Sequence, residues 1–189
     1  MTPLLTTSNV ESIKLDIGCG LHKRHGFIGV DLYAQSGVDL VVNLDKESLP
    51  YKDGSVDEIY SSHFLEHVID PLATLTELTR VLKENGLMSI IVPHYSNPYA
   101  YHFTHKSFWS SYSLEQNYLD YYLSGHLVLL SKKVRIVNIW PFDMLFTSLA
   151  NKSLSIYERF FSSFIKAWEV EFVLQKKFSG LSHISKELH

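Results

Sequence analysis

Residues 14–20 read Lys-Leu-Asp-Ile-Gly-Cys-Gly, an apolar strand that stops at a turn with two glycines. Gly18 and Gly20 let the backbone bend sharply and approach a ligand with no Cβ in the way. Asp16 lies at the end of this strand, and Asp31 closes the next predicted strand, 11 residues after Gly20. A carboxylate in that place can accept hydrogen bonds from ribose hydroxyls. The stretch therefore predicts an α/β fold that binds a nucleotide-like ligand.

The same stretch differs from the dinucleotide-binding fingerprint of nicotinamide enzymes. In that fingerprint a third glycine follows three residues after the second, whereas position 23 is a lysine in this chain. NAD binding, and with it an oxidoreductase activity, is therefore disfavoured.

The rest of the chain alternates predicted strands with helices. From their apolar runs, strands are expected at 13–17, 27–31, 38–44, 56–61, 87–92, 126–130, 134–140 and 169–176. The clearest helix follows Asp70, which can cap it, and ends at Asn85-Gly86. Pro71 suits its first position. Its apolar face, which we expect in the core, consists of Leu72, Leu75, Leu78, Val81 and Leu82. A further helix is expected over 153–164. This alternation predicts a mostly parallel sheet with helices on both faces.

Composition limits the class of protein. A chain of 189 residues, 46% hydrophobic and 20% charged, fits one globular domain over 1–189. The net charge of −3 makes nucleic acid an unfavoured partner, because proteins that hold phosphates are usually basic. The single cysteine, Cys19, allows no internal disulfide and fits a reducing compartment. With no recognisable signal peptide and no long apolar run, we expect a cytoplasmic protein without a membrane span.

Five motifs, taken in order, resemble the class I S-adenosylmethionine-dependent methyltransferases, in particular the small bacterial type-11-like group. They are Leu15-Asp-Ile-Gly-Cys-Gly20, Val30-Asp31, Leu49-Pro-Tyr-Lys-Asp-Gly-Ser-Val-Asp57, His63-Phe-Leu-Glu-His-Val68 and Arg80-Val-Leu-Lys-Glu-Asn-Gly86. The resemblance covers about residues 14–92. It implies a Rossmann-like methyltransferase fold with a seven-strand-type sheet, and an enzyme that takes its methyl group from S-adenosylmethionine.

The resemblance also implies which residues bind that cofactor. The glycine turn receives the methionine part, the acid after the second strand holds the ribose, and residues after the next two strands flank the adenine and line the pocket. These residues are Asp16, Gly18, Cys19, Gly20, Asp31, Asn43, Leu44, Ser61, Ser62 and His63. Only residues 21–26 separate the turn from the second strand, so a standard first helix does not fit. His22, Lys23 or Arg24 could neutralise the cofactor's carboxylate there, or could be solvated loop charges.

Methyl transfer from a sulfonium is an in-line displacement, which depends chiefly on positioning. Oxygen and nitrogen nucleophiles often also need a base that accepts their proton, or a metal that lowers their pKa. The segment 94–125 is rich in histidine and aromatic residues, and we expect it to be the substrate loop. We assign catalysis to His105, because the resemblance includes Thr104-His-Lys-Ser-Phe-Trp109, and name His94 as a second candidate.

A divalent metal is an alternative source of activation. His63, Glu66 and His67 have the i, i+3, i+4 spacing that gathers side chains on one helical turn. With His105 they suggest a site for Zn, Mn or Fe, whose predicted ligands are Glu66, His67 and His105. The arrangement is similar to that of small-RNA terminal 2′-O-methyltransferases and ubiquinone-pathway O-methyltransferases, which carry Glu at the position of His63. Non-metal methyltransferases also have Leu-Glu-His here, where it begins a helix.

We therefore expect methyl transfer to an oxygen or nitrogen of a small molecule, such as a sugar, a lipid precursor or a secondary metabolite. The alternatives are a non-catalytic cofactor-binding module that regulates or scaffolds a partner, and a metal-assisted RNA 2′-O-methyltransferase. The aromatic residues within 153–168 are expected to pack in the core, although a homodimer interface or contact with a membrane would also account for them.

Overall fold

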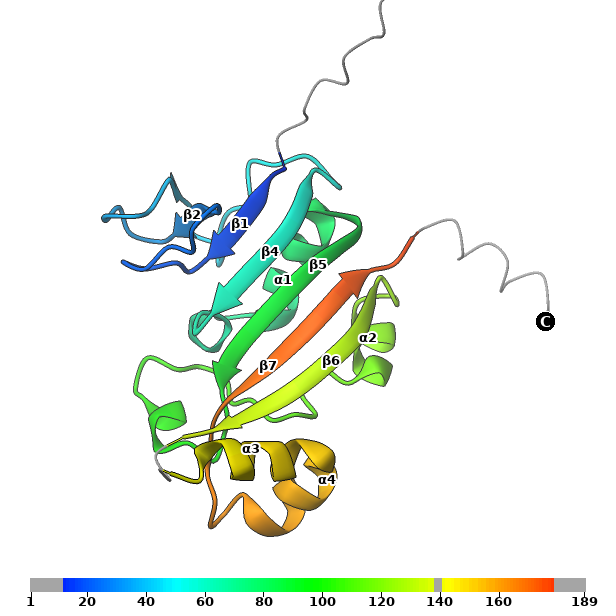
Figure 1. Cartoon of the computed structure of the whole chain (residues 1–189). Coiled ribbons are helices and arrows are strands. Elements are labelled where there is room, and N and C mark those ends of the chain that lie inside the picture. Colours follow the sequence, from blue (N-terminus) through cyan, green and yellow to red (C-terminus); the bar gives the residue numbers. More distant parts are fainter. Residues whose placement is uncertain (1–11, 138–140, 179–189) are drawn as a thin grey trace, which may run out of the picture.

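The computed structural model describes residues 12–137 and 141–178. These residues contain one seven-stranded sheet. Its strands are β1 (Lys14–Ile17), β2 (Ile28–Asp31), β3 (Leu40–Val41), β4 (Val56–Ser62), β5 (Leu82–Pro93), β6 (Leu127–Ile136) and β7 (Ala167–Lys176). The order across the sheet is β3-β2-β1-β4-β5-β7-β6, and β7 alone is antiparallel to both of its neighbours. The predicted seven-strand, mostly parallel sheet is confirmed (Figure 1). Both ends of the predicted domain, 1–11 and 179–189, lie outside the described residues.

The helices are short, and all of those described lie after β4. They are α1 (Pro71–Val81), α2 (Gln116–Tyr122), α3 (Asp143–Lys152) and α4 (Leu154–Ile156), with 3-10 turns η1 (Leu65–His67) and η2 (Pro98–Tyr101) and a π-helical turn η3 (Tyr157–Phe161). In Figure 1, α1 and α2 lie behind the sheet, and no helix crosses β4, β5 or β7 on the side toward the viewer. Within residues 18–55, the connections between the first four strands contain no helix. No helix in the described part of the chain has the length and apolarity needed to cross a bilayer.

The helix α1 begins as the sequence predicts but ends earlier. Asp70 caps it by accepting a hydrogen bond from the Ala73 N–H at 3.0 Å, and Pro71 occupies the first position. The chain becomes extended at Leu82, so the predicted end at Asn85-Gly86 is wrong; both residues lie within β5, where Asn85 has a φ of 62°. The prediction that Leu72 belongs to the core is also wrong, because it is 39% exposed. The buried face consists of Thr74, Leu75, Leu78, Thr79 and Val81.

The region after β5 differs more from the prediction. The two strands expected at 126–130 and 134–140 form the single strand β6, and residues 138–140 lie outside the described residues. Pairing of β6 with β7 shifts between Leu129 and Ser131, a bulge that interrupts the strand periodicity in the sequence. The helix α3 was not predicted, and the helix expected over 153–164 is divided between α4 and η3.

The segments that can form a ligand-binding site lie at one edge of the sheet. The carboxyl ends of β1 to β5 meet there, and in open α/β sheets such an edge holds the ligand. The strand β6 also ends at this edge and β7 begins there, so α3 and α4 lie beside it at the bottom of Figure 1. The fold thus places residues 141–166 next to the predicted substrate loop, which they contact through Glu158 and Ser162.

Candidate active site

A cavity of about 560 Å³ opens at this edge of the sheet. It is bounded by the turn after β1, the ends of β2 and β3, the segment after β4 and the loop after β5. Its lining residues are Gly18, Asp31, Leu32, Tyr33, Val42, Asn43, Leu44, Asp45, His63, Phe64, His67, Val68, Phe103, Thr104 and Lys106. Of the predicted cofactor residues, the cavity therefore brings together Gly18, Asp31, Asn43, Leu44 and His63.

The turn after β1 requires a residue without a side chain at position 18. The Gly18 N–H donates to the Val30 carbonyl at 2.8 Å, and Gly18 has a φ of +71°, which glycine adopts without strain. A Cβ built on Gly18 would lie 2.5 Å from the Cβ of Phe64, well inside van der Waals contact. Both the backbone and the packing of Phe64 therefore require glycine at this position.

Asp31 joins the turn to the end of β2. One carboxylate oxygen accepts a hydrogen bond from the Gly20 N–H at 2.9 Å, and the other accepts one from the Tyr33 N–H at 3.2 Å. The same carboxylate lines the cavity. Each carboxylate oxygen has a further lone pair, so Asp31 can still accept hydrogen bonds from ribose hydroxyls.

Several predicted cofactor residues support the turn instead of lining the cavity. The carboxylate of Asp16 is 3% exposed and accepts a hydrogen bond from the Arg24 N–H at 2.7 Å. Burial raises the pKa of Asp16, and this hydrogen bond opposes the change. The Ser61 side chain is also buried, and its hydroxyl has no hydrogen-bond partner within the described residues. The predicted residues outside the cavity lining are Asp16, Cys19, Gly20, Ser61 and Ser62.

The charged side chains of Lys23 and Arg24, in the short connection 21–26, contact other residues of the protein. Lys23 forms an ion pair with Asp39 at 2.7 Å. The guanidinium of Arg24 lies over the Tyr60 ring, 4.5 Å from its centre. Neither side chain lines the cavity, so of the two interpretations left open, the structure favours loop charges with their own partners.

His63 brings positive charge to the cavity. Its ring lies between two carboxylates, with Nε2 3.2 Å from Glu169 and Nδ1 3.5 Å from Glu66. The hydrogen bond with Glu169 and the contact with Glu66 raise the pKa of His63 to about 9. His63 is therefore an imidazolium at neutral pH, which suits it to an anionic part of a ligand and not to the role of a base.

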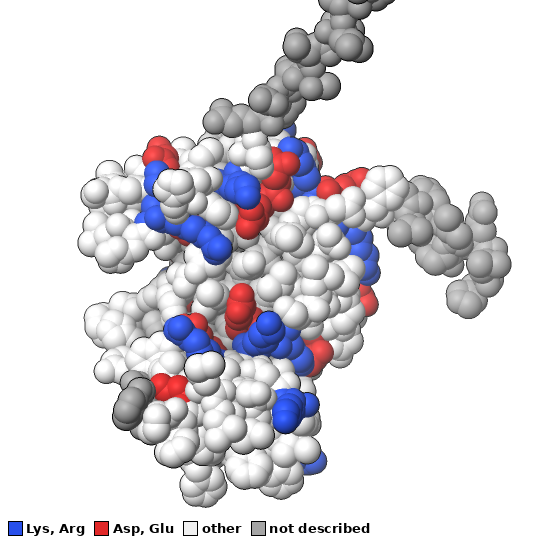
Figure 2. All heavy atoms as spheres, viewed as in Figure 1, with Lys and Arg blue, Asp and Glu red and all other residues white. Residues whose placement is uncertain are grey.

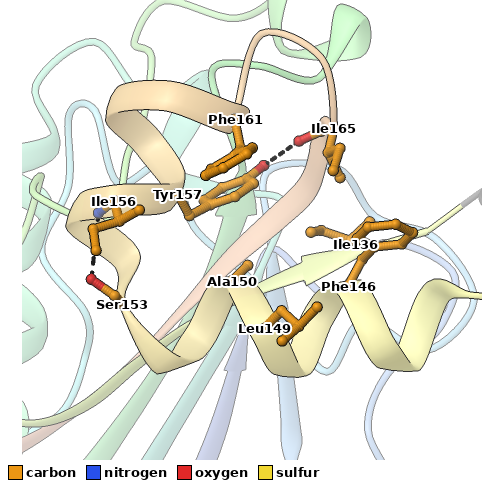
Figure 3. Close-up of a pocket in the computed structure, with 9 residues that line it drawn as sticks. All are labelled: Ile136, Phe146, Leu149, Ala150, Ser153, Ile156, Tyr157, Phe161 and Ile165. Carbon is orange, nitrogen blue, oxygen red and sulfur yellow. Dashed lines mark hydrogen bonds between the residues drawn. The ribbon is translucent and has the colours of Figure 1, made fainter.

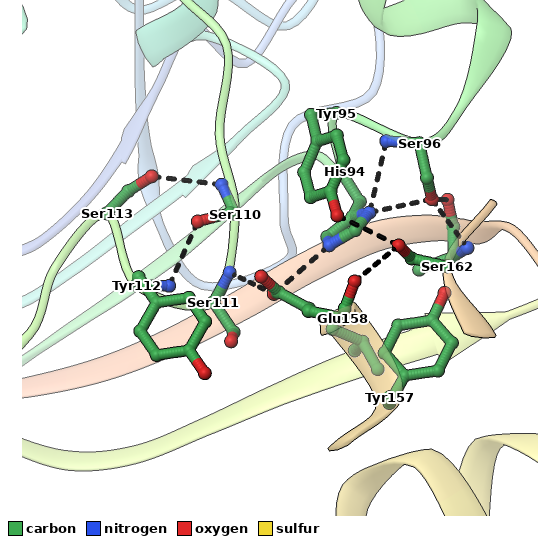
Figure 4. A network of polar contacts seen from close by, with 12 residues as sticks. His94, Tyr95, Ser96, Ser110, Ser111, Tyr112, Ser113, Tyr157, Glu158 and Ser162 are labelled. Atoms are coloured by element: carbon green, nitrogen blue, oxygen red, sulfur yellow. Dashed lines mark hydrogen bonds and ion pairs between the residues drawn. The ribbon is translucent and has the colours of Figure 1, made fainter. Parts of the chain in front are cut away.

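The structure places His94, the second predicted catalytic residue, outside the lining of this cavity. The side chain is fully buried, Nε2 lies 3.2 Å from Glu158 and Nδ1 lies 2.8 Å from the Ser96 hydroxyl. Glu158 also accepts a hydrogen bond from the Ser111 N–H at 2.7 Å (Figure 4). Both ring nitrogens are engaged away from the cavity, so His94 instead ties the end of β5 to η3.

The other predicted catalytic residue, His105, lies in a cluster with His67 and Glu66. The two imidazole rings are 4.6 Å apart and nearly perpendicular. His105 Nδ1 lies 2.9 Å from the Ala100 carbonyl, and His67 Nδ1 lies 3.4 Å from the Thr104 carbonyl. Because a carbonyl only accepts, each Nδ1 carries the hydrogen and each Nε2 keeps its lone pair.

Glu66 is the third member of this cluster. It is 1% exposed, and neither carboxylate oxygen has a hydrogen-bond partner within residues 12–137 and 141–178. One ligand atom from each of Glu66, His67 and His105 lies within 4.8 Å of the others. The structure thus brings together the three predicted metal ligands, and His63 Nδ1 lies 3.5 Å from the carboxylate of Glu66.

Some residues of the cavity were not predicted from the sequence. Tyr33 and Phe64 belong to it, as do Thr104 and Lys106, which flank His105. The position of Thr104 and Lys106 beside a predicted catalytic histidine was a usable signal. Phe64 had none, since its contact with Gly18 depends on the packing of β1 against β4.

The buried thiol of Cys19 gives a direct test of this turn. Burial raises the pKa of Cys19 to about 11, and the nearby carboxylates of Asp16 and Asp31 add to the effect. At about pH 8 we expect iodoacetamide to modify the folded chain at least ~100 times more slowly than the urea-unfolded chain, because the thiolate is the nucleophile. Mass spectrometry reports this site alone, since the chain has one cysteine. Equal rates in both states would contradict the closed turn.

Comparisons with known proteins agree with this geometry. Residues 15–90 match the family model of the methyltransferase domain. An S-adenosylmethionine-dependent methyltransferase from Mesorhizobium loti is 14% identical, with a TM-score of 0.57 over 88% of this chain and 91% of that chain. A putative sarcosine dimethylglycine methyltransferase from Galdieria sulphuraria is 16% identical, with a TM-score of 0.58 over 88% and 79%.

A third solved structure is geranyl diphosphate C-methyltransferase from Streptomyces coelicolor, in complex with Mg²⁺, geranyl diphosphate and S-adenosylhomocysteine. It is 20% identical, with a TM-score of 0.54 over 87% of this chain and 71% of that chain. Comparison with curated proteins finds no significant match. Its domain match over residues 15–90 and its fold make the chain similar to the S-adenosylmethionine-dependent methyltransferases.

Proposed function

We propose that the protein transfers the methyl group of S-adenosylmethionine to an oxygen or nitrogen atom of a small-molecule acceptor. One observation carries the proposal. A single cavity extends from Gly18 and Asp31 to Phe103 and Thr104, so the predicted cofactor turn and the predicted substrate loop open into the same space. The net charge of −3 favours a small molecule over a nucleic acid.

The cofactor residues divide into those that touch the ligand and those that shape its site. Asp31 accepts hydrogen bonds from the ribose, Asn43 and Leu44 flank the adenine, and Gly18 admits the methionine part, near the positive charge of His63. Asp16, Cys19 and Gly20 act through the shape of the turn, as their burial or hydrogen bonds indicate. The bound cofactor supplies an electrophilic methyl group on a sulfonium. We assign no role to Ser61 and Ser62.

His105 is the proposed general base. The Ala100 carbonyl holds the hydrogen on Nδ1, which leaves the Nε2 lone pair to accept a proton. In the reaction a bond forms between the acceptor atom and the methyl carbon while the carbon–sulfur bond breaks. His105 takes the proton that the acceptor loses, and S-adenosylhomocysteine leaves as a neutral thioether.

A metal-assisted reaction is the second candidate, favoured by the ligand atoms of Glu66, His67 and His105, which lie within 4.8 Å of one another. Two histidines and one carboxylate form a ligand set that suits Zn, Mn or Fe better than Mg. His67 and His105 each donate the Nδ1 hydrogen to a backbone carbonyl, which is the usual orientation of a metal-bound imidazole. A metal held here would lower the pKa of an acceptor hydroxyl. His105 would then be a ligand and not the base.

The glycine turn provides the first test of the cofactor site. In Gly18→Ala the new Cβ collides with Phe64 and the backbone keeps a positive φ, so we expect affinity for S-adenosylhomocysteine to fall at least ~10-fold. Gly54→Ala is the matched control, since its φ is +61° but nothing lies within 4 Å of the added Cβ. It should cost stability and leave binding unchanged. Titration calorimetry on both variants makes the comparison. A folded Gly18→Ala protein with native affinity would exclude Gly18 from the site.

The acceptor class can be tested with radiolabelled S-adenosylmethionine. We expect label in small molecules of a cell extract and not in its RNA or protein. The variant His105→Ala should lower the rate by about 100-fold or more and retain affinity for S-adenosylhomocysteine. His126→Ala, which changes an exposed histidine just before β6, should behave as the native chain. Label only in RNA would overturn the small-molecule proposal, and binding without any transfer would indicate a non-catalytic module.

The metal hypothesis needs a measurement that does not depend on activity. After chelator treatment, Co²⁺ added to the protein should produce visible d–d absorption bands that saturate at one ion per chain. Glu66→Gln should lower the Co²⁺ affinity at least ~10-fold, because it removes the charged ligand. Glu171→Gln, a carboxylate of β7 outside the cluster, should not change it. If native protein gives no Co²⁺ spectrum, or if Glu66→Gln gives the same one, the cluster is not a metal site.

A further inference from the structure

The segment between β6 and β7 turns many apolar side chains outward. We call residues 141–166, which include α3, α4 and η3, the apolar hairpin. The aromatic residues of 153–168 were expected in the core, yet Phe160, Phe161 and Phe164 are 62%, 48% and 85% exposed. The exposed large apolar residues of the hairpin are Phe142, Met144, Leu145, Leu149, Ile156, Phe160, Phe161 and Phe164. A surface of this kind usually marks a contact with another molecule or with lipid.

The exposed charges of the apolar hairpin are positive. Lys152, Arg159 and Lys166 are exposed, and the Arg159 guanidinium lies 5.9 Å from the centre of the Phe160 ring. Its carboxylates are Asp143, which is half-buried, and Glu158, which contacts His94. Figure 2 shows this lower part of the molecule as largely uncharged, with a few basic groups and an acidic group on its left side. The hairpin is thus basic on a chain whose net charge is −3.

The hairpin also encloses an apolar cavity of about 310 Å³ (Figure 3). Most of its lining is hydrocarbon, from Ile136 of β6, Phe146 and Leu149 of α3, and Ile156, Phe161 and Ile165. The Tyr157 hydroxyl donates a hydrogen bond to the Ile165 carbonyl at 2.7 Å, so this polar group in the wall is already satisfied. Such a cavity excludes water and accepts a hydrocarbon group.

The apolar surface continues toward the active-site cavity. Trp168, just after the hairpin, packs against Tyr99 with ring centres 5.4 Å apart, and both border a second hollow with Phe164. Tyr99 and Phe103 are 66% and 91% exposed, and Phe103 lines the cavity that we assign to the cofactor and acceptor. Trp and Tyr are enriched where proteins meet the lipid headgroups.

We propose that the apolar hairpin docks the protein on the surface of an anionic lipid bilayer. Outward Phe, Leu and Met side chains among Lys and Arg are the composition of segments that lie in the membrane interface. The positive charges argue for anionic lipid as the occupant, because an apolar contact with a second copy would bring like charges together. Docking would place the mouth of the active site beside the bilayer. If the proposed function holds, the acceptor is then a lipid or a lipid-linked molecule.

Vesicle flotation with the full chain tests this inference. We expect the protein to float with vesicles of phosphatidylcholine and phosphatidylglycerol in equal parts, and to remain largely free with phosphatidylcholine alone. Phe160→Ser with Phe164→Ser should lower the partition coefficient at least ~10-fold, because two apolar side chains no longer enter the interface. Both side chains are exposed, so the fold should survive. Tyr121→Ser, 80% exposed on α2, is the matched control and should float like the native chain.

The charge contribution is measured with a second pair of variants. Arg159→Gln with Lys166→Gln should lower the partition coefficient on anionic vesicles by roughly 30-fold, from about 1 kcal/mol for each basic residue. Lys46→Gln with Lys52→Gln removes the same charge from exposed positions between β3 and β4 and should have little effect.

Two outcomes would overturn the inference. One is the same weak flotation with anionic and neutral vesicles. The other is a dimer by light scattering that Phe160→Ser with Phe164→Ser dissociates, since the hairpin would then be a protein interface. Calorimetry with S-adenosylhomocysteine on the same samples separates this inference from the proposed function. Retained binding without flotation rejects only the membrane contact, whereas flotation without binding rejects only the cofactor site.

Discussion

The contact between Gly18 and Phe64 is the constraint on which the site depends. Phe64 occupies the place that a side chain at position 18 would need, and it directly precedes the 3-10 turn that carries Glu66 and His67. One packing contact therefore connects the bend after β1 to the segment that carries Glu66 and His67. Asp31 fixes the same bend from the other side through the Gly20 N–H.

Features that depend on local pattern and strand topology could be predicted from the sequence. The apolar runs located the strands, and their common edge brought Gly18, Asp31 and His63 to one cavity. The predictions failed where a residue's partner is distant in the chain. His94 follows a strand and looked available for catalysis, but Glu158, 64 residues away, and the β7 backbone enclose it. A single sequence contains no signal for such a contact.

A second kind of failure arose from the assumption that apolar residues face the core. That assumption holds for Leu75 and Leu78 of α1, but it misplaced Leu72 and the phenylalanines of the apolar hairpin. It also hid α3, whose outward face is apolar, so that no contrast between polar and apolar faces marked it as a helix. Where this chain departs from ordinary patterning, the departure coincides with an exposed apolar surface.

The His94–Glu158 pair explains how that surface stays close to the site. A fully buried imidazole paired with a carboxylate is costly to separate, because either partner alone would lose its hydrogen bonds without reaching water. The pair fixes η3 to the end of β5, and Tyr95 adds a hydrogen bond to Ser162 at 2.9 Å. The hairpin is thus anchored to the strand that leads into the substrate loop. These contacts therefore fix the position of the hairpin relative to the start of the predicted substrate loop.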